Sequence, residues 1–128
     1  FNWIRNRIDY EIEKLSRIAV SENDSVVDDL INSDIVIYWG STIALEALSM
    51  GIPLIRYRMG NLLSYDPLFE CDHLKWECSE DNSLIDTIES ICQLSDEEFS
   101  KRAQEAKKYL DRYFHPVTDS NLNKFVCV

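Results

Sequence analysis

The chain has 128 residues, of which 45% are hydrophobic, and its formal net charge is −10 at pH 7. This length and composition predict one globular domain over residues 1–128, and the short apolar runs, broken by charged residues, exclude a membrane-spanning helix. The acidic balance excludes broad nucleic-acid binding, which needs a basic surface, although a single nucleotide senses local amides and arginines rather than the overall charge.

The first part of the chain predicts a helix, a short strand and a second helix. Isoleucine and leucine recur at three- and four-residue spacing over residues 1–15, which indicates an amphipathic helix. Residues 17–21 predict a short strand. Either Asp24 or Ser25 can then cap a helix over residues 26–31.

The central part predicts a strand, a helix and another strand. Residues 35–39 are continuously apolar, as expected for a strand that helices cover on both faces. A helix follows after Ser41 and runs to about Met50, because Gly51 suits its left-handed C-terminal position and Pro53 prevents its continuation. Residues 54–57 then predict a second buried strand.

The last part predicts one weaker strand and two helices. The strand covers residues 74–78, and apolar spacing over residues 85–92 indicates a helix. Ser95 and Glu98 form a capping box that opens a longer helix, whose apolar face extends as far as Phe114. Strands that alternate with helices predict parallel pairing through right-handed crossovers. We therefore expect an α/β fold, a Rossmann-like parallel sheet of about four strands flanked by helices, with a helical C-terminal segment.

The segment Gly40-Ser41-Thr42, between the first central strand and its helix, is the main candidate binding site. Gly40 permits a sharp turn and the close approach of a ligand, and the free amides at a helix N-terminus favour an anion such as phosphate. The hydroxyls of Ser41 and Thr42 can add hydrogen bonds to phosphate oxygens. Glu46 lies on the same helix face as Thr42, roughly 6 Å further along the axis, where a carboxylate can accept hydrogen bonds from ribose hydroxyls. The alternative is that Ser41 is an ordinary helix cap and Glu46 a solvated charge.

Two arginines join this candidate site. Arg56 and Arg58 follow Leu54-Ile55, at the carboxyl edge of the sheet where the Gly-Ser-Thr turn is also expected. Their guanidinium groups are suited to neutralising phosphate, and the alternative is that both are solvated loop charges.

The stretch from Ser33 to Ile55 resembles the carboxy-terminal domain of GT-B fold glycosyltransferases of the bacterial surface-polysaccharide type, and of the related UDP-N-acetylglucosamine 2-epimerases. In those families a strand ends in a loop of small residues, followed by a helix bearing a glutamate, a Gly-x-Pro and a second strand. The resemblance implies one half of a GT-B fold, with Ser41 and Thr42 on the donor diphosphate and Glu46 on its ribose. The epimerases usually have a second glycine at the position of Thr42, which favours the transferases.

By this resemblance the full-length protein is an enzyme, a glycosyltransferase that moves a sugar from a UDP- or CMP-linked donor to a surface or capsular glycan. The acceptor site and the catalytic base come from an amino-terminal domain. We expect that domain to be missing, because the sequence begins with Phe1 and shows no signal-peptide pattern. We therefore expect the chain alone to bind the donor without turnover, and no catalytic residue, cofactor or metal is assigned to it. Two alternatives stay open: a nucleotide-sugar epimerase domain, and a non-catalytic α/β module that binds a protein partner through helices over residues 83–114.

Cysteine usage favours a reducing compartment. Cys71, Cys78, Cys92 and Cys127 form no Cys-x-x-Cys pair, and neither histidine lies at ligand spacing from them. We therefore expect free thiols rather than a metal site or a disulfide framework. This pattern predicts a cytoplasmic protein. For the full-length enzyme, the alternative is peripheral attachment to the inner membrane.

Overall fold

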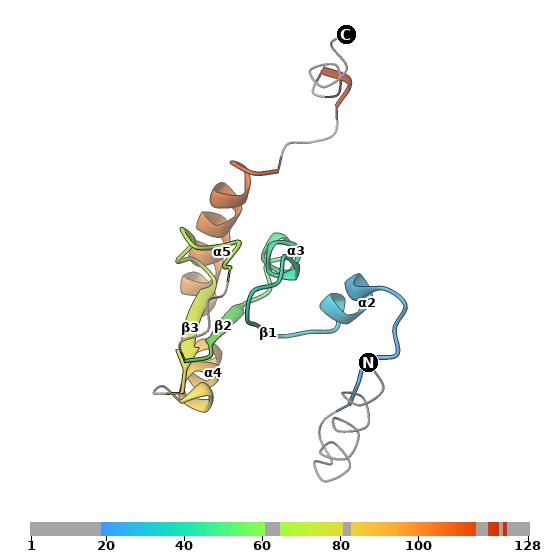
Figure 1. The fold of residues 1–128 in the computed structure, drawn as a ribbon. Coiled ribbons are helices and arrows are strands. Elements are labelled where there is room, and N and C mark those ends of the chain that lie inside the picture. The colour runs from blue at the N-terminus through green and yellow to red at the C-terminus, as the bar shows by residue number, and fades with distance from the viewer. Residues whose placement is uncertain (1–18, 61–64, 81–82, 115–117, 121, 123–128) are drawn as a thin grey trace. The chain divides into compact units, whose positions relative to one another are not determined.

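The computed structural model describes residues 19–60, 65–80, 83–114, 118–120 and 122, and it divides into two units, residues 1–32 and 33–128 (Figure 1). In the first unit, helix α2 (Val26–Ile31) begins after Ser25, whose side chain accepts a hydrogen bond from the Val27 amide at 3.2 Å. This cap confirms one of the two predicted capping residues. The helix predicted over residues 1–15 lies outside the described residues. Residues 19–21 form no strand, so the strand predicted there is wrong over its described part.

The second unit contains a parallel sheet of three strands in the order β1-β2-β3, which confirms the α/β class (Figure 1). The strands are β1 (Val36–Tyr38), β2 (Leu54–Arg58) and β3 (Lys75–Ser79). Their register aligns Tyr38, Arg56 and Glu77 across the sheet. About four strands were expected, and the described residues contain three.

Strand β1 is shorter than predicted, and one of its faces is less buried than predicted. It has three residues rather than the five of residues 35–39, and Ile37 is 50% exposed. Among the described residues, β1 is an edge strand that pairs with β2 alone, and its side chains alternate between the faces of the sheet. Tyr38 is therefore buried on one face while Ile37 is half open on the other, so the expectation of complete covering on both faces is wrong for this residue.

Helix α3 (Ile43–Ser49) connects β1 to β2 and packs against both strands and against α5. It buries Ala44, Ala47 and Leu48. The helix is slightly shorter than predicted, since it was expected from after Ser41 to about Met50, but its end is confirmed, because Gly51 has a φ of +77° in the left-handed region.

Helix α4 (Leu84–Cys92) follows β3 and covers one face of the sheet. It begins at Ser83, whose hydroxyl accepts a hydrogen bond from the Asp86 amide at 3.2 Å. Its residue Ile91 forms a buried cluster with Ile55 of β2 and Cys78 of β3. These contacts place an apolar layer on the sheet face opposite that of Arg56, because neighbouring strand residues point to opposite faces.

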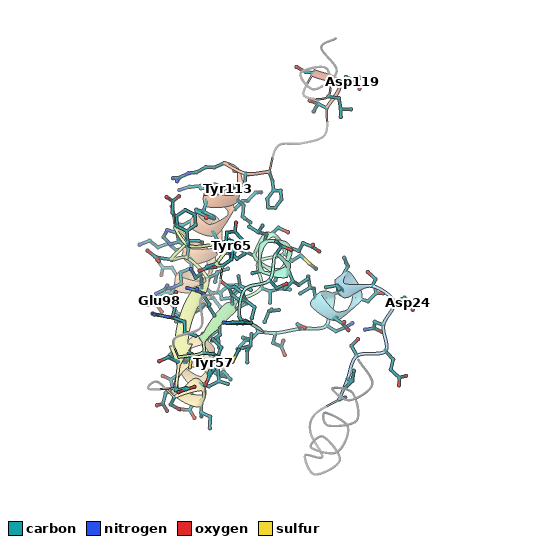
Figure 2. The ribbon with its side chains drawn as sticks, in the orientation of Figure 1. Asp24, Tyr57, Tyr65, Glu98, Tyr113 and Asp119 are labelled. Carbon is teal, nitrogen blue, oxygen red and sulfur yellow. The ribbon has the colours of Figure 1, made fainter. Side chains whose placement is uncertain are left out.

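Helix α5 (Asp96–Leu110) begins with the predicted capping box. The Ser95 hydroxyl accepts from the Glu98 amide at 3.3 Å, and a Glu98 carboxylate oxygen accepts from the Ser95 amide at 3.2 Å. The helix ends four residues earlier than the predicted apolar face, and the amides of Arg112 and Tyr113 donate to the carbonyls three residues back, of Tyr109 and Leu110, as in a tightened last turn. Figure 2 shows Glu98 near the start of α5 and Tyr113 beyond its end.

Two further expectations concern the state of the cysteines and the presence of a membrane-spanning helix. Cys71, Cys78 and Cys92 are free thiols. Among the described residues, no helix has both the length and the apolar character that crossing a bilayer requires.

Candidate functional site

The Gly40-Ser41-Thr42 turn lies where the sequence predicts it, between the carboxyl end of β1 and the first residue of α3. All three residues are exposed. The Ser41 hydroxyl accepts a hydrogen bond from the Ile43 amide at 3.3 Å, and Thr42 is the N-cap residue without a capping hydrogen bond from its side chain. Gly51 and Gly60 have left-handed backbone conformations, whereas Gly40 does not. The turn therefore does not require a positive φ at Gly40.

Glu46 is exposed in the first turn of α3. Among the described residues, its carboxylate has no hydrogen-bond or ion-pair partner. The side chain lines a hollow of about 490 Å³ between α3 and α5, whose other residues include Met50, Lys107 and Phe114. An unpaired carboxylate beside an apolar hollow can accept hydrogen bonds from a ligand that carries hydroxyl or N–H donors.

The two predicted arginines are engaged with carboxylates. The Arg56 guanidinium lies 3.4 Å from Asp66 Oδ2 and 3.0 Å from Glu77 Oε1. The Arg58 guanidinium lies 3.4 Å from Glu77 Oε2, and its side chain is 60% exposed. Arg56 is thus held against two carboxylates, whereas Arg58 remains largely open to a ligand. The hollow beside Glu46 includes neither arginine, so the structure brings the predicted residues together as two groups, one on α3 and its turn and one on β2.

The Arg56 partner Asp66 is the centre of a buried polar network that sequence reasoning missed. Its Oδ2 accepts from the Lys75 ammonium at 2.7 Å, and its Oδ1 accepts from the Tyr38 hydroxyl and the Leu68 amide, each at 3.0 Å. The Lys75 ammonium also donates to the Leu68 carbonyl at 2.6 Å. These bonds tie the segment before β3 to the face of the sheet. The sequence offers no signal for this role, because Asp66 directly precedes Pro67, a pair that is typical of an ordinary loop turn.

The pKa values in this network follow from burial and from the partners. Burial alone would raise the pKa of Asp66, but hydrogen bonds from Lys75, the Leu68 amide and Tyr38 hold it below the ordinary value. Burial, together with the charge of Asp66, raises the pKa of the Tyr38 hydroxyl. Asp66 is therefore a carboxylate and Tyr38 a neutral donor at neutral pH. Each oxygen of the Asp66 carboxylate accepts at least one hydrogen bond and the Lys75 ammonium donates two, which indicates a structural role rather than a catalytic one.

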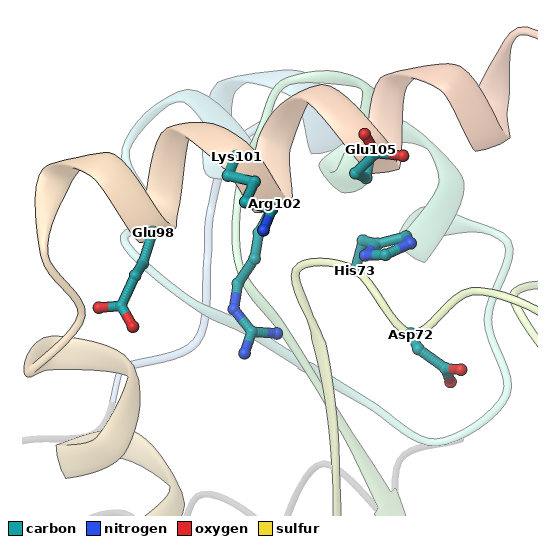
Figure 3. A pocket seen from close by; sticks show the side chains of 6 residues that line it. All are labelled: Asp72, His73, Glu98, Lys101, Arg102 and Glu105. Atoms are coloured by element: carbon teal, nitrogen blue, oxygen red, sulfur yellow. The ribbon is translucent and has the colours of Figure 1, made fainter.

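A second hollow, of about 400 Å³, lies between the start of α5 and the segment before β3. Figure 3 shows Asp72 and His73 on that segment, and the other four lining side chains on α5. Several of its charges already have partners: Arg102 lies over the Trp76 ring at 5.4 Å, and Glu98 belongs to the capping box. The mixture of acidic and basic groups gives this hollow no preference for one class of ligand. The lining residues are Asp72, His73, Glu98, Lys101, Arg102 and Glu105.

Comparisons with known proteins found no match from which a function could be inferred. No family model, no curated protein and no solved structure matches this chain. Within the described ranges, no group of three or more histidine, cysteine, aspartate or glutamate side chains is arranged to hold a metal ion.

Proposed function

We propose that this chain is the donor-binding domain of a glycosyltransferase, which transfers a sugar from a nucleotide-sugar to a surface or capsular glycan. The observation that carries the proposal is the unit β1-α3-β2. Its strands are parallel, and an exposed Gly-Ser-Thr turn at the carboxyl end of β1 leads into a helix with the exposed carboxylate of Glu46 in its first turn. Parallel sheets bind nucleotides at this place, beyond the carboxyl ends of the strands.

In this proposal, the diphosphate and the ribose bind at successive positions along α3. The diphosphate binds at the Ser41 and Thr42 hydroxyls and the nearby amides, where the positive end of the helix dipole favours an anion. Glu46 accepts hydrogen bonds from the ribose, one turn further along the same face. Arg58 is the better cation for the diphosphate, because Arg56 is already held by Asp66 and Glu77. The acceptor and the catalytic base belong to another domain of the full-length enzyme in this proposal.

A titration of the chain with UDP, CMP, GDP and ADP, followed by amide NMR, tests the proposal. We expect shifts at residues 40–46 and at the end of β2, and strongest for one base. A flat response to all four nucleotides at millimolar concentration contradicts donor binding by this chain and favours the protein-interaction module. A product assay on the full-length protein then separates a transferase from an epimerase, because only the transferase releases a free nucleotide and a lengthened glycan.

A further inference from the structure

The hollow between α3 and α5 lies along the helix face that carries Glu46. Thr42, Glu46 and Met50 follow one another at four-residue spacing, so they form one stripe on the helix, and all three are exposed. Ala103, Lys107 and Phe114 belong to the α5 side of the same hollow. None of the turn residues 40–42 lines the hollow, whose α3 side begins at Glu46. A ligand that begins at the Gly-Ser-Thr turn and runs along this stripe therefore enters the hollow at Glu46 and reaches α5 there.

The chemistry of the hollow combines an apolar floor with a few polar groups. Met50, Leu110 and Phe114 supply the apolar surface, and the Phe114 side chain is 49% exposed. The charged groups are Glu46, Lys107 and Asp111. Among the described residues Lys107 has no ion-pair partner, whereas the adjacent Lys108 is paired with Glu105 at 2.6 Å. A volume of about 490 Å³ is within the range of small-molecule sites.

We infer that this hollow holds the nucleoside part of the nucleotide, with the ribose on Glu46 and the base stacked on Phe114 and bonded at its edge by Lys107. The inference rests on the proposed function and extends the site to α5. A nucleobase has an apolar face, which can stack on an aromatic ring. Its edge carries hydrogen-bond donors, which suit the Asp111 carboxylate, and acceptors, which suit the Lys107 ammonium. The two carboxylates repel a diphosphate, so the phosphates lie back at the Ser41 turn.

The position of the base is tested with two probes on the whole chain. Inorganic pyrophosphate carries only the diphosphate, and should shift the amides of residues 41–43 alone. The nucleotide that gives the strongest response should shift those amides and also the amides of Lys107, Leu110 and Phe114. If the nucleotide binds and leaves the α5 amides unmoved, the base lies elsewhere and the inference fails, while the proposed function stands.

Matched substitutions give a second readout. We expect Phe114→Leu, which keeps an apolar side chain but removes the ring, to weaken nucleotide binding about 10-fold. Phe69→Leu, at a residue that is 68% exposed and does not line the hollow, should leave the affinity unchanged within about two-fold. Lys107→Gln should weaken binding in the same way, and Lys108→Gln should not. Equal affinities for each variant and its control contradict the inference, whereas failure of every nucleotide to bind overturns the proposed function together with it.

Discussion

The Lys75 ammonium lies 2.7 Å from Asp66 Oδ2, and the two side chains are only 5% and 4% exposed. This ion pair joins the segment before β3 to the first residue of that strand. Tyr38 on β1 and Arg56 on β2 reach the same carboxylate, so Asp66 connects all three strands of the sheet. The position of β1, and therefore of the turn that follows it, depends on this network.

Asp66→Ala should lower the free energy of unfolding by about 3–5 kcal/mol, because it leaves the buried Lys75 ammonium without its counter-charge. Lys108→Ala is the matched control. Its pair with Glu105 is solvent-exposed, at 69% and 39%, so its loss should cost far less than the loss of Asp66. Urea unfolding of both variants measures the difference. Equal losses for the two variants would show that Asp66 does not hold the sheet together.

The Asp66 carboxylate also makes the free energy of unfolding depend on pH. The pKa of Asp66 in the folded chain lies below its ordinary value of 3.8, so the unfolded chain takes up the proton first as the pH falls. The stabilisation is therefore fully present above about 3.8 and is lost as the pH falls through the folded pKa. Urea unfolding at a series of pH values should show the gap between wild type and Asp66→Asn narrowing in acid. A gap that stays constant or widens contradicts the assigned pKa direction.

Gly51→Ala should destabilise the chain by about 1 kcal/mol, because an L side chain strains the left-handed backbone after α3. The backbone there has a φ of +77°, and an added Cβ would meet no atom within 4 Å, so no steric clash contributes. Gly51→Asn should cost less, since asparagine tolerates this conformation. Thermal unfolding compares the two, and an alanine variant as stable as wild type would rule out the strain.

Elements that depend on neighbouring residues were predicted well from the sequence. The Ser25 cap, the capping box of Ser95 and Glu98, and the stop at Gly51 each need only a few adjacent positions. Strands β2 and β3 were also located to within one residue.

Features that depend on distant residues were not predicted. Asp66 meets Tyr38 from 28 positions away and Lys75 from nine, and nothing in the local sequence indicates either contact. The same network explains why Arg56, which looks like a free phosphate ligand in the sequence, is held by carboxylates in the fold. The half-open Ile37 depends on which strands lie beside β1, which apolar composition alone does not reveal.

The most direct measurement is the calorimetric affinity of wild type, Glu46→Ala and Glu89→Ala for the nucleotide with the strongest NMR response. Glu89 is an exposed helix carboxylate on α4 and serves as the control. If Glu46 binds the ribose, its loss should weaken binding by about 1.5–3 kcal/mol for each hydrogen bond removed, with the fold and the affinity of Glu89→Ala unchanged. Equal affinities for all three proteins would contradict a nucleotide site at the start of α3.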